Sequence, residues 1–277
     1  MILVTAATAP VGRSIVEQLA AANRPVRALT RDPERAGLPA SAEVVAGDLS
    51  DPASLPAAFQ DVTAAFLLAV VPGVAPAFLA AARDAGVRRI VFQSSAAIDD
   101  SAGEQPNDVA QFHHDIEREI RESGLEWTFL RLDVSSSDAL NWAFDVPGQL
   151  AAGDVIRGPY AQAHVSPIHP ADLAAVAVAA LTGDEHAGQT YHVTGPASMT
   201  LAEQVRLVGE ALGRPLRYEE LSPEQARTAI SPYAPADLLF EDWERHIGTP
   251  APVTDTIQRV TGRPARSVHE WAASYRT

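Results

Sequence analysis

The sequence predicts an α/β protein with a doubly wound, parallel, Rossmann-type sheet and a small, mostly helical C-terminal lobe. The clearest evidence is at the start of the chain. Residues 2–4 are apolar, as in a buried parallel strand, residues 5–10 are small, and residues 11–19 carry apolar side chains at helical spacing. A strand, a tight turn and a helix in this order begin a nucleotide-binding fold, in which the helix N-terminus faces a phosphate.

Further apolar runs continue this alternation of strands and helices. The expected strands are residues 26–29, 44–45, 64–70, 89–93 and 127–131, and the expected helices include 74–85 and 108–123. This pattern predicts a nucleotide-binding domain over residues 1–183 and a smaller substrate or lid lobe over residues 184–277. Residues 142–160 contain three glycines and are expected to be irregular and to cross over the site.

Capping-box patterns predict the helices of the C-terminal lobe. In such a box a Ser or Thr side chain and a Glu or Gln three residues later bond to each other's backbone N–H groups. Three pairs have this spacing: Thr200 with Glu203, Ser222 with Gln225, and Ser267 with Glu270.

Composition excludes several classes of function. The formal net charge of −14 and the pI near 4.9 argue against nucleic-acid binding, which needs a basic face. The chain has no cysteine, which excludes disulfides and thiolate metal sites, and we expect no metal. It also has no lysine, which excludes a P-loop and the Tyr-x-x-x-Lys pair of ordinary short-chain dehydrogenases.

The chain is expected to be soluble and cytoplasmic. Residues 64–82 are uncharged over the length of a membrane span, but Pro72, Gly73 and Pro76 interrupt them, so we interpret them as core and expect no membrane association. No signal peptide is expected, because core residues follow Met1 at once. The absence of cysteine is compatible with a reducing compartment, and the sequence leaves the oligomeric state open.

The turn TAATAPVG at residues 5–12 resembles the TGATGxxG loop of NmrA-like atypical short-chain dehydrogenases/reductases. The phrases RALTRDPERA, IEREIRESGLEWTFLR and VTGRPARSVHEWAAS are similar to that family as well. Ala6 and Ala9 stand where the family usually has glycine. We expect that Ala6 adds a methyl group where the backbone needs a positive φ, and that Ala9 adds one where a pyrophosphate would approach the main chain.

The resemblance implies NADP(H) as cofactor. Arg31 lies at the end of the second strand, where a guanidinium group can bind a 2′-phosphate through two donors. The alternative for Arg31 is a solvated side chain that pairs with Asp32 or Glu34. The expected cofactor-binding residues are Thr5, Ala7, Thr8, Ala9, Pro10, Val11, Gly12, Arg31, Asp48, Leu49, Ala69 and Val70. The altered loop also allows the alternative that no nucleotide binds.

Four residues are candidates for proton transfer or for a hydrogen bond to substrate: Ser94, His113, Asp133 and Tyr160. Ser94 follows the fifth strand, where dehydrogenases of this superfamily place a serine that polarises a carbonyl, although it could merely close the turn. A catalytic lysine of the isoflavone-reductase branch aligns on or within two residues of His113. A histidine there could donate a proton near neutral pH, or it could be an ordinary surface residue near Glu117. Asp133 could be an acid/base group or a helix cap.

Three functions fit these residues. The first is an NADPH-dependent oxidoreductase that acts on a small carbonyl, enone or quinone-like molecule. The second is a non-catalytic NADP-binding sensor or regulator, which the missing Tyr-x-x-x-Lys pair supports. The third is a Rossmann-fold enzyme that makes no redox use of a cofactor and performs an isomerisation, dehydration or cyclisation by proton transfer, which the altered loop supports.

Overall fold

A computed structural model describes residues 1–137, 139–232 and 234–272, and these form two compact units. The first unit contains Met1–Leu132 and Pro170–His192, and the second contains Asp133–His169 and the chain from Val193 onward. This division differs from the single boundary expected after residue 183. The chain leaves the first unit at the end of its sixth strand and returns to it for one helix and one strand.

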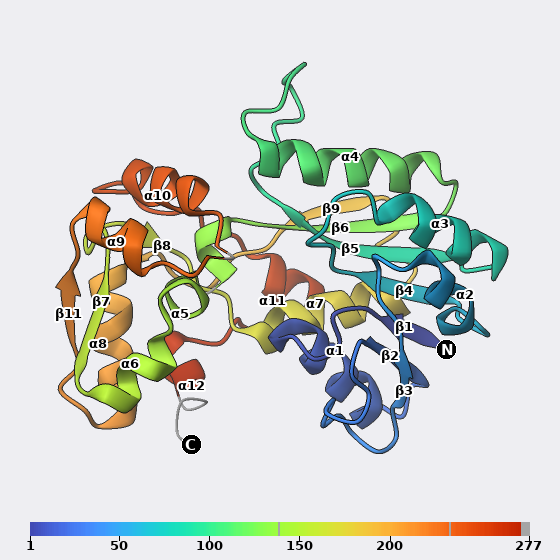
Figure 1. Ribbon diagram of the computed structural model, residues 1–277, viewed down its shortest axis with the longest axis horizontal. Coiled ribbons are helices and arrows are strands. Elements are labelled where there is room, and N and C mark those ends of the chain that lie inside the picture. Colours follow the sequence, from blue (N-terminus) through green and yellow to red (C-terminus); the bar gives the residue numbers. More distant parts are fainter. Residues whose placement is uncertain (138, 233, 273–277) are drawn as a thin grey trace. The chain divides into compact units, whose positions relative to one another are not determined.

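The first unit is built on a seven-stranded sheet (Figure 1). Its strands run in the order β3-β2-β1-β4-β5-β6-β9, and every pairing between them is parallel. The bounds are β1 Ile2–Val4, β2 Val26–Thr30, β3 Glu43–Ala46, β4 Ala64–Leu67, β5 Arg89–Ser95, β6 Glu126–Leu132 and β9 Gln189–His192. The order reverses between β1 and β4, as in doubly wound nucleotide-binding folds, so the predicted fold class is confirmed.

Helices cover both faces of this sheet (Figure 1). Helices α1 (Pro10–Ala21) and α7 (Pro170–Thr182) pack on each other on one face. The other face carries α3 (Ala75–Asp84), α4 (Asp108–Glu122) and the short elements η1 (Pro52–Ser54) and α2 (Leu55–Ala58). Both layers bury the middle of the sheet, which is why β1 and β4 are short continuous apolar runs rather than alternating ones.

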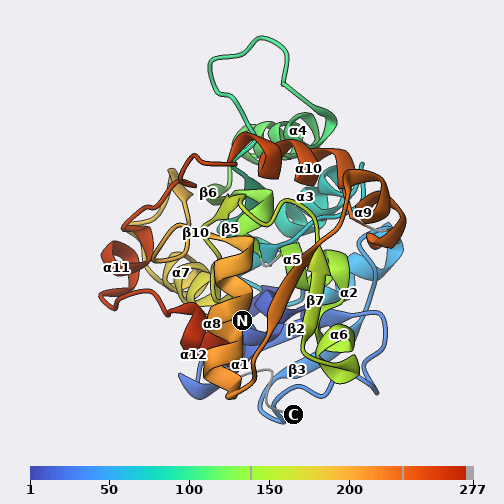
Figure 2. The ribbon, with the colours of Figure 1, turned by 90° about the vertical axis from the view of Figure 1, so that its left-hand side faces the viewer.

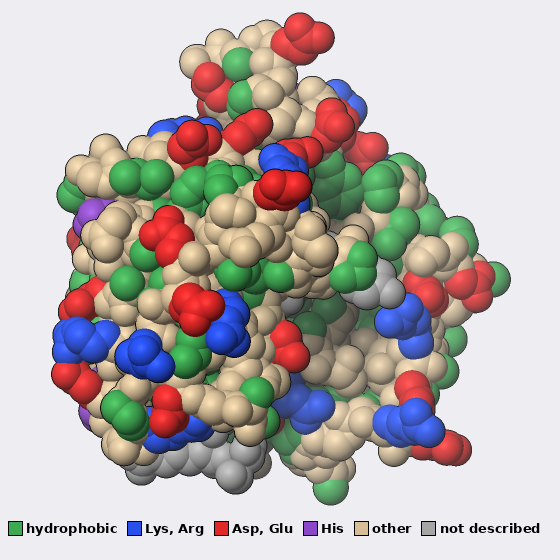
Figure 3. Space-filling view, turned by 60° about the vertical axis from the view of Figure 1, so that its left-hand side comes forward, with side chains coloured by type: hydrophobic (Ala, Val, Ile, Leu, Met, Phe, Trp, Pro, Cys, Tyr) green, Lys and Arg blue, Asp and Glu red, His purple; other side chains and the backbone are tan. Residues whose placement is uncertain are grey.

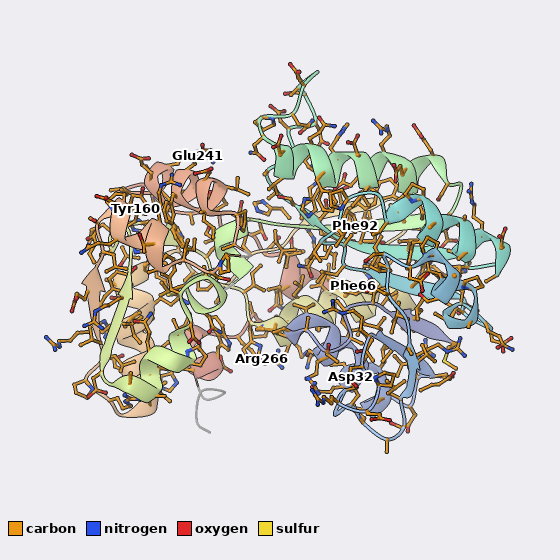
Figure 4. All side chains as sticks on the ribbon, viewed as in Figure 1. Asp32, Phe66, Phe92, Tyr160, Glu241 and Arg266 are labelled. Atoms are coloured by element: carbon orange, nitrogen blue, oxygen red, sulfur yellow. The ribbon has the colours of Figure 1, made fainter. Side chains whose placement is uncertain are left out.

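Aromatic side chains fill the core on the α3 and α4 side. Phe92 of β5 and Phe129 of β6 are fully buried, with ring centroids 6.3 Å apart in an edge-to-face arrangement. Phe59 and Phe78 make a similar edge-to-face pair at 5.0 Å. Phe66 of β4 (Figure 4) is also fully buried, but it lies outside this cluster, because successive strand residues alternate and its neighbours Ala65 and Leu67 face the α3 and α4 side. This packing fixes the strands whose carboxyl ends form the candidate site.

The second unit mixes helices with two small sheets (Figure 2). In one sheet β7 (Val155–Gly158) pairs in parallel with β11 (Arg217–Glu220), and in the other β8 (His164–Val165) pairs with β10 (Met199–Thr200). Around them lie η2 Val134–Ser137, α5 Ala139–Phe144, α6 Val146–Ala152, α8 Leu201–Leu212, α9 Pro223–Ala229, α10 Ala236–Arg245, α11 Thr256–Thr261 and α12 Val268–Ala272. Trp243 is fully buried at the core of this unit.

The structure tests several local predictions in this unit. The irregular segment expected over residues 142–160 is wrong, because α6 and β7 lie within it. Helix α6 starts where Asp145 caps it by accepting a bond from the Gly148 N–H. Two of the three capping-box pairs are confirmed: Ser222 and Gln225 form a complete box, and Ser267 and Glu270 bond to each other's N–H groups. Thr200 caps α8 by accepting from the Glu203 N–H, but the Glu203 side chain accepts from Arg206.

Membrane spans, surface charge and metal ligands were considered in the sequence, and the structure bears on each. Among the described residues, no helix combines the length and the apolar character needed to cross a membrane. On the face shown in Figure 3, acidic side chains are interspersed with arginines, in keeping with the net charge of −14. Within the same described part of the chain, no cluster of His, Asp and Glu side chains is arranged to hold a metal ion.

Candidate active site

The turn after β1 has an unusual backbone. Ala6 lies at φ +48°, in the left-handed region that costs a residue with a Cβ atom roughly 1–2 kcal/mol. The Ala9 N–H closes the turn by donating to the Ala6 carbonyl at 2.9 Å. The positive φ expected at position 6 is therefore confirmed, and the alanine occupies it under strain.

Gly12 allows helix α1 to approach this turn closely. A Cβ atom at position 12 would overlap the Ala6 carbonyl oxygen and would stand 2.8 Å from the carbonyl carbon. Neither backbone atom can move without opening the turn. Of the glycines usual in the family's loop, this sequence keeps the one that the packing of strand, turn and helix requires.

The N-terminus of α1 has the features of an anion-binding site. Ala9 occupies the N-cap position in an extended conformation and makes no side-chain cap, and Pro10 follows as the first helical residue. Val11 and Gly12 then carry N–H groups that the first turn of a helix leaves without intrahelical partners. The first turn also contains no acidic residue. Such an end binds phosphate through its N–H groups and the helix dipole.

A groove of about 300 Å³ begins at this turn and runs over the carboxyl ends of β1, β2 and β4. Of the predicted cofactor-binding residues, Thr8, Ala9, Arg31, Asp48, Leu49 and Val70 line it. Thr5, Ala7 and Ala69 are buried beside it, and Thr5 accepts a bond from the Leu68 N–H at 2.9 Å. Eight residues outside the predicted cofactor-binding set also line the groove: Ala6, Leu29, Thr30, Gly47, Ser50, Leu68, Val71 and Val74.

Arg31 is exposed at the groove, and its charge acts on Asp48. The pKa of Asp48 is held below its ordinary value, first by hydrogen bonds from the Ser50 hydroxyl and N–H and also by the nearby charge of Arg31. Asp32 pairs with Arg35 at 3.7 Å. Within residues 1–137, Arg31 itself forms no ion pair, so its guanidinium group is available to a ligand.

The loop after β4 presents apolar side chains at the same groove. Val70 is 78% exposed and Val71 is 45% exposed, and both line the groove. Exposing valine side chains to water is unfavourable in free energy, and covering them with a flat ring of a ligand would remove part of that apolar surface from water. This loop suits the apolar part of a nucleotide.

Ser94 is turned away from the carboxyl edge of the sheet. Its hydroxyl is buried and donates to Glu117 Oε1 at 2.6 Å, on the face covered by α4. The adjacent Ser95 points to the opposite face, as successive strand residues do. Ser95 is also buried, and its oxygen accepts a bond from the Ala97 N–H at 3.1 Å, which leaves its own O–H proton to donate. Of the two, Ser95 has the hydroxyl suited to a ligand.

His113 is packed into the interface of α4 and β5. Its ring stacks on Phe92 with centroids 6.0 Å apart and meets Phe112 edge-to-face at 5.0 Å. Its Nδ1 donates to the Val109 carbonyl at 2.8 Å. Burial lowers the pKa of His113, although the Val109 carbonyl and the charge of Glu117 oppose that shift. The ring is therefore predominantly neutral at pH 7.

Tyr160 and Asp133 belong to the second unit. Tyr160 lies at φ +50° and packs against Phe240 and Trp243, with centroids 5.8 and 6.5 Å away (Figure 4). Burial and the charge of Glu244 raise the pKa of Tyr160, so it stays a neutral hydroxyl. The Asp133 carbonyl accepts a bond from the Ser136 N–H at the start of η2. The roles predicted for these two residues stay predictions.

Comparison with known proteins identifies the family. The chain belongs to a family of NAD(P)H-binding proteins, whose model matches residues 6–184. It is 42% identical to a (4-alkanoyl-5-oxo-2,5-dihydrofuran-3-yl)methyl phosphate reductase of Streptomyces griseus, over 99% of this chain and 98% of that protein. It is 34% identical to an NAD(P)H azoreductase of Xenophilus azovorans, over 99% and 98% of the two chains.

A solved structure shows the same fold. An NADPH-dependent quinone oxidoreductase of Escherichia coli superposes with a TM-score of 0.76 at 23% identity, over 99% of both chains. The comparisons confirm an NAD(P)H-binding protein and the prediction of an NAD(P)H-dependent oxidoreductase, and they favour it over the sensor and proton-transfer alternatives. The narrower assignment to NmrA-like proteins stays a prediction.

Proposed function

We propose that this protein uses NADPH to reduce a small conjugated carbonyl compound, an enone or a quinone. The observation that carries the choice of NADPH is the exposed guanidinium group of Arg31, which lines the groove and forms no ion pair with the other described residues. A guanidinium group offers two parallel donors to a phosphate and has no comparable advantage with a 2′-hydroxyl group.

The substrate class is supported by the chemistry shared by the relatives' substrates. The ring named for the Streptomyces griseus relative has a C=C bond conjugated with a ring carbonyl and with an alkanoyl carbonyl. Quinones and azo compounds, named for other relatives, are likewise conjugated acceptors of two electrons. An acceptor of this kind takes a hydride at one end of the conjugated system and a proton at an electronegative atom or the adjacent carbon.

Three parts of the groove would each hold a different part of the cofactor. The Val11 and Gly12 N–H groups bind the pyrophosphate, Arg31 binds the 2′-phosphate, and Val70 and Val71 cover an apolar surface of the nucleotide. When bound, NADPH supplies the hydride. Held by these residues, the nucleotide would lie over the carboxyl ends of β1 and β4, where doubly wound sheets bind their ligands.

Ser95 is the residue best placed to hydrogen-bond a carbonyl oxygen as negative charge develops on it. It ends β5, the strand next to the central β4, and its oxygen accepts from the Ala97 N–H, while its own O–H donates to no partner among the described residues. A donor fixed before the reaction stabilises an oxyanion without having to reorganise. His113 remains a predicted proton donor, but its lowered pKa makes the protonated form scarce at pH 7. The final proton would then come from another acid or from water.

The test is turnover of the purified protein with a panel of acceptors. NADPH consumption should match product formation with a small quinone and with an acyl-substituted unsaturated lactone. A saturated ketone of similar size serves as the control and should react far more slowly, because it lacks the conjugated acceptor. The proposal fails if NADPH binds but no conjugated carbonyl in the panel is reduced.

A further inference from the structure

A buried cluster of ions lies beneath the carboxyl ends of β5 and β6. Glu117 of α4 is fully buried and accepts bonds from Arg131 Nε at 2.9 Å, from an Arg131 terminal nitrogen at 2.8 Å and from Arg121 at 2.8 Å. It also accepts the bond from Ser94. Arg131, on β6, is itself only 8% exposed. One carboxylate thus joins a helix to two adjacent strands.

Asp100 extends this cluster into loop 96–107, which connects β5 to α4. Its two carboxylate oxygens accept bonds from the two terminal nitrogens of Arg131 at 2.6 and 2.8 Å. The Asp100 side chain is 67% exposed, in contrast to its partner. The hydrogen bonds from Arg131, and then its charge, hold the pKa of Asp100 below its ordinary value, so the pair stays ionised at neutral pH.

The rest of loop 96–107 is closed on itself. Asp99 accepts bonds from the N–H and hydroxyl groups of Ser101, and the Gln105 side chain bonds to the backbone of Asp99 at both its N–H and its carbonyl. In Figure 1 the loop stands out from the end of α4. The bidentate contact of Asp100 with Arg131 therefore ties a self-contained loop to the sheet.

Neutralisation of charge alone does not explain the geometry of the contact. Arg131 also bonds to Glu117, so Asp100 is not its only anionic partner, although Glu117 is shared with Arg121. An exposed carboxylate in an ion pair contributes little to stability. A planar bidentate pair does, however, fix the orientation of its two groups. The contact is suited to setting the position of the loop.

We propose that Asp100 is a positioning residue, which fastens loop 96–107 to Arg131 and so sets how the carbonyl substrate binds. The loop begins immediately after Ser95, at the edge of the sheet where ligands of doubly wound folds bind. A substrate held at Ser95 lies beside the first residues of this loop. The inference rests on the proposed reductase function.

The first test separates substrate binding from cofactor binding. Asp100→Asn should raise KM for the carbonyl substrate by about fivefold and leave kcat and the NADPH Kd within about twofold of the parent. Asp100→Glu, which restores the charge and the two oxygens, should recover most of the loss. The matched control is Asp115→Asn, which removes an ion pair to Arg118 on α4 but leaves loop 96–107 untouched. A role in stability alone would alter the melting temperature and spare KM.

The second test requires no turnover. Glu104 is exposed within the loop, and a glutamate-specific protease should cleave after it several times faster in Asp100→Asn than in the parent or in Asp115→Asn. Unchanged cleavage overturns the positioning of the loop, whatever the protein's activity. Faster cleavage with unchanged KM also overturns the proposal, because the loop would then not act on substrate. A wild-type protein that reduces no carbonyl would instead contradict the proposed function.

Discussion

The carbonyl group of Ala6 and the Cα atom of Gly12 are in direct apposition, with no space for a side chain between them. A Cβ atom at position 12 would overlap the Ala6 oxygen. This contact brings the first turn of α1, which carries the N–H groups of Val11 and Gly12, against the turn after β1, where Ala6, Thr8 and Ala9 line the groove.

Replacing Gly12 by alanine should therefore damage both folding and cofactor binding. The added methyl group must push α1 away from the turn, which should lower the free energy of unfolding by about 1–3 kcal/mol. NADPH affinity should fall by more than about tenfold as the N–H groups move. Denaturant unfolding and calorimetric titration measure the two effects. If Gly12→Ala bound NADPH as tightly as the parent, the turn would be able to accommodate a Cβ atom at position 12, and the prediction would be wrong.

The two alanines of the loop should respond differently to glycine. Ala6→Gly relieves a left-handed residue, a gain of roughly 1–2 kcal/mol that offsets the roughly 0.4–1 kcal/mol of added unfolded-state entropy. Ala9 lies at φ −73°, so Ala9→Gly brings only the entropic loss. Urea unfolding should show Ala6→Gly as stable as the parent or more so, and Ala9→Gly as less stable. The reverse order would contradict the strain assigned to Ala6.

Arg31 should decide the choice between the two nicotinamide cofactors. Wild-type protein should bind NADPH at least about tenfold more tightly than NADH, which corresponds to about 1.4 kcal/mol. Arg31→Ala should remove most of that preference by weakening NADPH binding and sparing NADH. Arg35→Ala is the control, because Arg35 carries the same charge nearby and pairs with Asp32. Equal affinities in the wild type would refute the assignment.

His113 can be tested through turnover and its dependence on pH. If it donates the proton, His113→Gln should lower kcat by about 10²-fold, and His114→Gln, its neighbour on α4, should have a far smaller effect. Burial lowers the pKa of His113 from 6.5, so a rate that depends on its protonated form should rise as pH falls below that value. Folding stability should decline over the same range, because the unfolded chain binds the proton more readily. A flat pH profile with unchanged kcat in the variant removes His113 from the reaction.

Local patterns in the sequence predicted much of the fold. The apolar runs, the small-residue turn and the capping boxes depend on residues close in sequence, and the structure places them as expected. The need for a positive φ at position 6 could also be anticipated, because the family that the loop resembles usually has glycine there. The boundaries of the two units could not be predicted, because each unit contains two separate stretches of chain. They depend on where the chain returns to the first unit at α7.

The candidate site was harder to predict where it depends on tertiary contacts. Ser94 and Ser95 are equivalent in sequence, and only the position of α4 shows that Ser94 faces Glu117 and Ser95 the opposite layer. The ion cluster joins Asp100, Glu117 and Arg131, which no local spacing relates. One signal was present: an arginine between Leu130 and Leu132 in a predicted buried strand needs a buried partner.

The central claim is that this chain transfers hydride from NADPH to a conjugated carbonyl compound, and isotope transfer tests it most directly. NADPH deuterated at C4 on one face of the ring should be mixed with the protein and a conjugated acceptor that reacts at carbon, and the product analysed by mass spectrometry. We predict that one of the two deuterated forms delivers a single deuterium to each product molecule and the other delivers none. Product formed without deuterium from either form, or formed in the absence of NADPH, would contradict the account.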